Sequence, residues 1–275
     1  MKRGLEKSDG CFDARVSEIL EQLQTACLEI LAENLLGIYV HGSLAFGCFH
    51  WEISDIDVLL VTEQPPLQAE KEALLKELLA INELCPPKGL EMSLVLERYL
   101  EPFCYPTPFE LHYSNAHQRN CEENLEEYCA HMNGTDKDLA AHIMVIRQVG
   151  ITLYGRPIGE MFGKVPKEAY LDSLYYDIAS AAEDVIKNPV YVICNLCRVL
   201  AYVTDRLVLS KAEGARWLQC QAARLGEELS FQEGLAFVKE AEESYRNSIP
   251  FQINGREEQL KEFAEKLSQA CWRSS

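Results

Sequence analysis

The sequence predicts an α/β domain followed by an all-α domain. Apolar, β-rich segments alternate with helical segments as far as residue 114, strand signals are absent beyond about residue 165, and helical periodicity fills the remainder. The length of 275 residues suits two domains. We expect domains 1–163 and 164–275, because glycine and proline interrupt the chain at 155–157 and again at 163–166.

In the first half, helices and strands are expected to alternate with short connections. Apolar residues at helical spacing predict a first helix that ends before Gly37, and β-branched and aromatic runs bounded by glycine or proline predict the strands. The expected order is helix 13–36, strand 37–42, strand 54–62, helix 67–84, strand 90–96, loop 102–108 and short strand 109–114.

The second half carries only helical periodicity, so we expect a bundle of about five helices. Breaks are expected at Asn188-Pro189, near Ser210, near Gly226 and at Ile249-Pro250. The predicted helices cover 167–187, 189–206, 210–224, 229–246 and 255–271. A cleft between the two domains is the expected position of a ligand site.

Charge and hydropathy exclude several classes of protein. The 26 basic and 43 acidic residues give a net charge of −17, which is unfavourable for binding nucleic acid. Apolar stretches of only a handful of residues cannot span a membrane, and the N-terminus lacks the apolar region of a signal peptide. We therefore expect a cytoplasmic protein without nucleic-acid or membrane partners. We also expect a monomer.

The 11 cysteines are scattered among apolar residues, as expected for small buried hydrophobic side chains in a reducing compartment. Cys194 and Cys197 form the only Cys-x-x-Cys pair, and without a second pair they do not indicate a zinc site. The aromatic residues Tyr191, Tyr202 and Trp217 lie at helical spacing among apolar neighbours, so we interpret them as core residues.

Two aspartates stand at the start of the strand predicted over 54–62. Side chains two residues apart on a strand point the same way, which places the carboxylates of Asp55 and Asp57 about 6–7 Å apart. They repel one another unless a cation lies between them. Carboxylate oxygens suit Mg²⁺, so the pair is a candidate metal site, although an isolated Asp-x-Asp is more often only solvated.

Residues on the neighbouring segments strengthen this interpretation. Gly42 and Ser43 follow the preceding strand, where glycine permits close approach of a ligand and free N–H groups at a helix start can bind phosphate. Glu91 lies on the strand predicted over 90–96, an expensive place for an unpaired charge. If that strand is adjacent, Glu91 completes a three-carboxylate cluster as a metal ligand or a general base.

These motifs together resemble the DNA-polymerase-β-like nucleotidyltransferase superfamily. The residues that carry the resemblance are Gly42-Ser43, Ser54-Asp55-Ile56-Asp57 and Glu91. In the helical half, segments 188–202 and 210–217 resemble the C-terminal domain of aminoglycoside adenylyltransferases, and more narrowly of the spectinomycin and streptomycin 3''/9-adenylyltransferases. The resemblance extends over about residues 35–250.

The resemblance implies an enzyme that transfers AMP from ATP to a hydroxyl of an antibiotic and releases pyrophosphate. It implies two Mg²⁺ ions on Asp55, Asp57 and Glu91, with Glu91 also the base that deprotonates the antibiotic hydroxyl. The residues implied to contact the nucleotide are Gly42, Ser43, Ser54, Asp138, Arg198 and Lys211. Closure of two domains on ATP would complete the site only when both substrates are present.

The acceptor is less well defined, because the chain departs from streptomycin-modifying relatives at two places. Asn188-Pro189 replaces an acidic pair, and the segment 109–120 lacks a tryptophan, so a cationic drug would lose carboxylate and aromatic partners. We therefore favour spectinomycin over streptomycin, with Glu110, Glu122 and Glu123 as candidate sources of acidity. The alternatives are a lincosamide or another small molecule, a protein side chain, or a catalytically silent nucleotide-binding protein.

Overall fold

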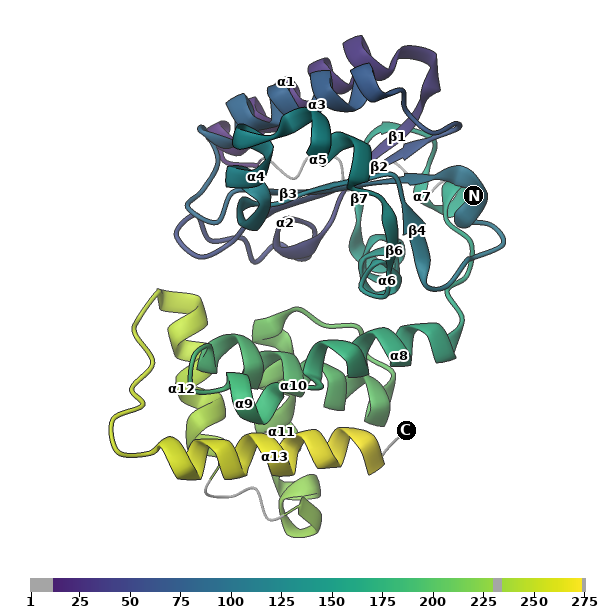
Figure 1. Cartoon of the computed structure of the whole chain (residues 1–275). Coiled ribbons are helices and arrows are strands. Elements are labelled where there is room, and N and C mark those ends of the chain that lie inside the picture. The colour runs from purple at the N-terminus through teal and green to yellow at the C-terminus, as the bar shows by residue number, and fades with distance from the viewer. Residues whose placement is uncertain (1–11, 230–233, 274–275) are drawn as a thin grey trace.

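The computed structural model describes residues 12–229 and 234–273, and it has the predicted α/β plus all-α architecture (Figure 1). The sheet and its helices occupy one end of the molecule and the C-terminal helices the other. One hydrophobic cluster extends from the sheet into the helical part, so the two parts share buried surface. The boundary between residues 163 and 164 stays a prediction.

The main sheet has five strands in the order β5-β3-β2-β1-β7. Their bounds are β1 Leu35–Val40, β2 Ile56–Thr62, β3 Leu90–Leu96, β5 Leu111–Tyr113 and β7 Ile151–Gly155. Strands β2 and β3 are parallel, joined by helix α3 (Gln68–Asn82), and the other neighbours are antiparallel. A separate small sheet pairs β4 (Thr107–Phe109) with β6 (Gly134–Asp136).

The alternation of side chains along β2 decides which way the candidate site faces. Val58 and Leu60 belong to the cluster beneath α1 (Ala14–Leu31) and α3, which cover one side of the sheet (Figure 1). Leu59 and Val61 belong to the cluster that includes α6 (Leu139–Val149) and the C-terminal helices. Asp57 shares the face of Leu59 and Val61, so the strand directs its carboxylate toward the helical half.

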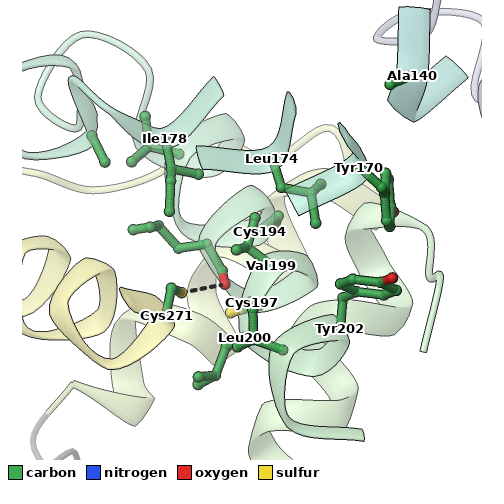
Figure 2. Packing of buried hydrophobic residues seen from close by; sticks show 14 of the residues in the cluster. Ala140, Tyr170, Leu174, Ile178, Cys194, Cys197, Val199, Leu200, Tyr202 and Cys271 are labelled. Atoms are coloured by element: carbon green, nitrogen blue, oxygen red, sulfur yellow. Dashed lines mark hydrogen bonds between the residues drawn. The ribbon is translucent and has the colours of Figure 1, made fainter. Parts of the chain in front are cut away.

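The helical half is built around α10, which begins with Pro189 at its first helical position and is buried along most of its length. Its helices are α8 Lys167–Ile178, α9 Ala181–Asp184, α10 Pro189–Asp205, α11 Lys211–Leu229, α12 Leu235–Asn247 and α13 Glu257–Arg273. Figure 2 shows Tyr170 and Tyr202 meeting edge to face, with ring centroids 4.5 Å apart, beside the apolar packing of α10.

Several element boundaries differ from the predictions. The helix predicted over 167–187 is divided into α8 and α9 at Ser180, whose hydroxyl donates to the Asp184 carboxylate. The break predicted near Gly226 is wrong, because α11 continues to Leu229; one glycine costs a helix only about 1 kcal/mol. The helix predicted to begin at 229 starts at Leu235, and residues 230–233 lie outside the described residues.

In the α/β half, the first helix ends at Leu31, and β1 begins at Leu35, before the predicted strand start. The strand predicted over 109–114 is interrupted at Glu110, and β4 extends into the expected loop. Strands β6 and β7 and helix α6 were not predicted from the sequence. The remaining short helices are α2 Gly42–Phe46, α4 Gln118–Glu123, α5 Leu125–His131 and α7 Ile158–Met161.

The described cysteines are all free thiols, but they are not all buried. Cys194 and Cys197 lie in the apolar packing of α10, with Cys271 nearby donating its thiol to the Leu196 carbonyl at 3.5 Å (Figure 2). Burial raises the pKa of the Cys194 thiol to about 12, which disfavours metal binding. The expectation of buried cysteines is wrong for the exposed Cys104 and Cys220, and Cys11 lies outside the described residues.

Among the residues that the structure describes, none of the helices combines the length and the apolar character that a bilayer crossing requires.

Candidate active site

A cavity of about 280 Å³ is lined by residues of both halves of the molecule. Every residue predicted to act in catalysis or to bind metal or nucleotide lines it. These residues are Gly42, Ser43, Ser54, Asp55, Asp57, Glu91, Asp138, Arg198 and Lys211. The fold therefore brings together positions that are up to 169 residues apart in the sequence (211 − 42).

Three carboxylates meet on the sheet side of this cavity. Asp57 and Glu91 are register partners on the parallel strands β2 and β3, while Asp55 immediately precedes β2 rather than lying on it. Carboxylate oxygens of the three residues lie within 4.8 Å of one another. Burial, reinforced by the charges of Asp55 and Glu91, holds the pKa of Asp57 well above its usual range. The negative charges of the three carboxylates are not balanced by the positive charges near them, so the cluster fits a divalent cation.

The turn between β1 and α2 lies directly beside these carboxylates. The His41 N–H donates to the Asp57 carbonyl at 3.0 Å, and the Ser43 N–H donates to the Asp57 carboxylate. The Ser43 hydroxyl is buried and has no hydrogen-bond partner among the described residues. A buried unpaired hydroxyl is costly, so this one fits a ligand oxygen such as that of a phosphate. The Ser54 hydroxyl accepts the His50 N–H at 3.0 Å.

Gly42 is required in this turn for two reasons. Its φ of +57° lies in the left-handed region, and a Cβ atom there would lie 1.8 Å from Asp57 Oδ2. We expect Gly42→Ala to lower the free energy of unfolding by about 3 kcal/mol, through backbone strain and displacement of Asp57. Urea unfolding measures the loss.

Gly47→Ala is the matched control for that substitution. Gly47 has a φ of +70°, but no atom lies within 4 Å of the position its Cβ would take. We expect this variant to lose only the strain of the backbone, about 1 kcal/mol. Equal losses for the two variants would show that the contact with Asp57 contributes nothing.

Two cations face the carboxylates from the helical half. Arg198 projects from α10, and Lys211 is the first residue of α11. Burial and the charge of Arg198 lower the pKa of Lys211, whereas Asp55 and Asp57 oppose that effect. A cavity with carboxylates on one wall and cations on the other fits an anion accompanied by a divalent cation.

Asp138 lies immediately before α6 and lines the same cavity. Burial raises its pKa to about 6; the charge of Asp177 acts in the same direction, and His142 opposes it. His142 also packs against His41, with ring centroids 4.8 Å apart. Burial and the proximity of His142 hold the pKa of His41 well below its usual range, so His41 is a neutral packed residue beside the site.

One aromatic residue that was predicted to lie in the core lines the cavity, and several other cavity residues were not predicted from the sequence. Tyr191 is 43% exposed and lines the cavity, so its interpretation as a core residue is wrong, whereas Tyr202 is in the core at 7%. Cavity residues that were not predicted include His142, Asp177, Ser210 and Tyr245. The spacing of Tyr191, Asn195 and Arg198 places three polar side chains on one face of an apolar helix, a signal that was available in the sequence.

The glutamates considered as acidic substitutes near the acceptor do not line the cavity. Glu110 lies 4.0 Å from Lys71, and Glu122 and Glu123 make their contacts within α4. A second cavity of about 180 Å³ shares Asp177 and Tyr191 with the first and is also lined by Asp184. The acidic residues that line this second cavity, Asp177 and Asp184, therefore both come from the helical half.

Comparisons with known proteins match both halves of the chain. Residues 20–119 match a nucleotidyltransferase domain, and residues 160–270 match the C-terminal domain of aminoglycoside adenylyltransferase. A spectinomycin 9-adenylyltransferase of Campylobacter jejuni is 22% identical over 210 residues, which cover 75% of this chain and 78% of that protein.

A crystal structure shows the same fold over nearly the whole chain. It is that of the spectinomycin adenyltransferase AAD(9) from Enterococcus faecalis with ATP and spectinomycin, which superimposes with a TM-score of 0.75 at 16% identity. The match covers 93% of this chain and 99% of that one. The chain therefore combines a nucleotidyltransferase domain with the C-terminal domain of aminoglycoside adenylyltransferases, one on each side of the cavity, and it is a nucleotidyltransferase enzyme.

Proposed function

We propose that the protein transfers AMP from Mg·ATP to a hydroxyl of an aminoglycoside-type antibiotic, with spectinomycin favoured over streptomycin, and releases pyrophosphate. The observation that carries this proposal is the cluster of Asp55, Asp57 and Glu91 facing the cations of the helical half across one cavity. The named activities of both relatives support it. A cytoplasmic location, where ATP is available, and a monomeric state belong to the same proposal.

The residues of the cluster fit Mg²⁺ because they offer only oxygen ligands and carry excess negative charge. Asp55, Asp57 and Glu91 would hold two ions. Bound Mg²⁺ would neutralise phosphate charge and the charge that develops during transfer. Gly42, Ser43 and Ser54 would contact the triphosphate, and the free hydroxyl of Ser43 supports that assignment.

The nucleotide would be enclosed from the other side by the helical half. Arg198 and Lys211 would bind its phosphates, and Asp138 would lie near the nucleotide. Cations fixed around the reacting phosphate stabilise the charge of the transition state, which is the main contribution a protein makes to nucleotidyl transfer. The domain division at 163/164 gives each half one wall of this site.

Glu91 is proposed as the general base. Its carboxylate would accept the proton of the acceptor hydroxyl while that oxygen forms a bond to the α-phosphorus. The bond from the α-phosphorus to the bridging oxygen of pyrophosphate breaks, and pyrophosphate departs with the electron pair. Glu91 lies beside Asp57, on the strand between β2 and β5, and therefore at one edge of the cluster. This position supports its role as the base.

The acceptor would lie next to Glu91 and extend toward the second cavity. Asp184 lines that cavity, and its carboxylate suits the ammonium groups of an aminocyclitol antibiotic. Asn188, which lines the same cavity, is neutral where streptomycin-modifying relatives are acidic, which favours spectinomycin.

Pyrophosphate release tests the proposal directly. Purified protein is incubated with Mg·ATP and, in turn, spectinomycin, streptomycin, other aminoglycosides or lincomycin, with Asp57→Asn as the blank. We expect release that depends on spectinomycin and is absent from the blank. Release with lincomycin alone would identify a lincosamide acceptor and contradict the proposed one. Binding of Mg·ATP without release would instead favour another small molecule, a protein side chain, or a silent nucleotide-binding protein.

A further inference from the structure

We propose that Asp177, at the end of α8, is a positioning residue that holds both Arg198 and Lys211 ready for the phosphates of the nucleotide. The inference rests on the proposed function, because it assumes that these two cations bind phosphate. Asp177 lines the cavity, but its two carboxylate oxygens are already engaged by side chains of α10.

The first branch of the network leads to Arg198. Asp177 Oδ2 accepts a hydrogen bond from the Asn195 amide, and Asn195 Oδ1 in turn accepts one from Arg198 Nη1 at 3.2 Å. The bond to Asp177 fixes which end of the Asn195 amide is the acceptor, so the oxygen faces the guanidinium group. Asn195 is only 3% exposed, which limits competition from water.

The second branch leads to Lys211. Asp177 Oδ1 accepts a hydrogen bond from the Tyr191 hydroxyl at 2.9 Å, which fixes the orientation of that ring. Lys211 Nζ lies 4.6 Å from the centroid of the same ring, within the range of a cation–π contact. One carboxylate therefore restrains both cations, each through a single intervening side chain.

Such a restraint matters because Arg198 and Lys211 repel one another and have long, flexible side chains. The charge of Arg198 contributes to lowering the pKa of Lys211. Without support, both side chains would lose rotamer freedom on binding the nucleotide, which weakens affinity. Support that exists before binding reduces this loss.

The test is the affinity of Asp177→Asn for Mg·ATP, measured by isothermal titration calorimetry without an acceptor. We expect the dissociation constant to rise about tenfold, because asparagine cannot accept both hydrogen bonds as the carboxylate does. The sign is informative. If Asp177 acted only as a nearby negative charge, its removal would tighten binding of the anionic nucleotide, and that result would overturn the inference.

Asp172→Asn is the matched control. Asp172 lies on the same helix, accepts the Tyr105 hydroxyl at 2.6 Å and pairs with Lys137, but it does not line the cavity. We expect this variant, which loses the same charge, to bind Mg·ATP within about twofold of the unsubstituted protein. An equal loss of affinity in both variants would overturn the assignment to Asp177.

Two further variants separate positioning from a loss of folding. Tyr191→Phe keeps the ring beneath Lys211 and removes only its hydroxyl, at a partly exposed position, and we expect about a threefold rise in the dissociation constant. In an Arg198→Gln background, Asp177→Asn should lower the affinity for Mg·ATP clearly less than it does alone, because the guanidinium group that Asp177 restrains through Asn195 is already absent. The inference would be overturned if the effects of Asp177→Asn and Arg198→Gln on affinity were fully additive. It would also be overturned if Asp177→Asn and Tyr191→Phe each left the affinity unchanged.

The same titrations distinguish this inference from the proposed function. If the unsubstituted protein binds Mg·ATP and Asp177→Asn binds it equally well, the network is refuted and the proposed function stands. If the unsubstituted protein does not bind Mg·ATP, the proposed function fails, and the inference fails with it.

Discussion

Replacement of Glu91 by glutamine is expected to lower the rate constant of AMP transfer about 1,000-fold and to leave the affinity for Mg·ATP within about threefold. Glutamine keeps the size of the side chain on β3 and an oxygen that can still ligate Mg²⁺ beside Asp55 and Asp57, but its amide cannot accept the proton of the attacking hydroxyl. We expect the rate to change without a large change in affinity, because Glu91 is half-buried at the edge of the cluster, next to its register partner Asp57.

Single-turnover transfer and calorimetric titration with Mg·ATP measure the two quantities separately. Glu122→Gln is a suitable control, since Glu122 is exposed on α4 and does not line the cavity. A large loss of Mg·ATP affinity in Glu91→Gln would identify Glu91 mainly as a metal ligand. Near-normal transfer would show that another group takes the proton.

The sheet side of the site could be predicted from the sequence because strands carry their geometry in short patterns. Two aspartates at the start of an apolar, β-rich run marked the head of a buried strand. The face that Asp57 takes did not follow from the sequence, because residues 58–61 are apolar and buried on both faces of the sheet. Glu91 was placed beside Asp57 only on the assumption that its strand is a neighbour, and the parallel β2–β3 pairing confirms that assumption.

The helical side could be predicted only in part. Arg198 and Lys211 were identified by resemblance, because a charge on a helix gives no indication of the cavity it faces. Tyr191 looks like a core residue among its apolar neighbours, but it is exposed because it lines the two cavities. Asp177 was missed because its partners lie 14 and 18 residues away, on another helix.

Strand β7 shows a similar limit within the fold. Residues 151–155 form a short edge strand that pairs antiparallel with β1, more than 100 residues earlier in the chain. Five residues with mixed burial do not produce the alternation that identifies a strand in a sequence. The packing of the whole sheet half determines a pairing over that distance. A short stretch of sequence carries no information about it.

Asp57→Asn is expected to lower the rate of AMP transfer by about 1,000-fold or more. The same substitution is expected to make the metal-free protein more stable. The two effects share one cause. Asp57 is held among like charges, so a neutral side chain relieves repulsion in the absence of metal. We expect the melting temperature at pH 7 to rise by about 2–4 °C, which corresponds to about 1 kcal/mol for a chain of this size.

The pH dependence of stability provides a second test of the same cause. The folded pKa of Asp57 lies above the unfolded value of 3.8, so the native state binds more protons between those two values. The metal-free protein should therefore lose stability as pH rises through that window, and it should lose none from this group below it. Asp57→Asn should be free of this contribution.

Magnesium should reverse the order of the two proteins. Adding Mg²⁺ with ATP stabilises the native state by mass action, and we expect the unsubstituted protein to gain several degrees while Asp57→Asn gains little. Thermal unfolding with and without Mg·ATP measures this difference. If Asp57→Asn instead melts at a lower temperature than the unsubstituted protein without metal, other groups of the protein already compensate the charge of the carboxylate cluster. That result would refute a cluster whose charges are arranged for a cation, even if transfer were lost.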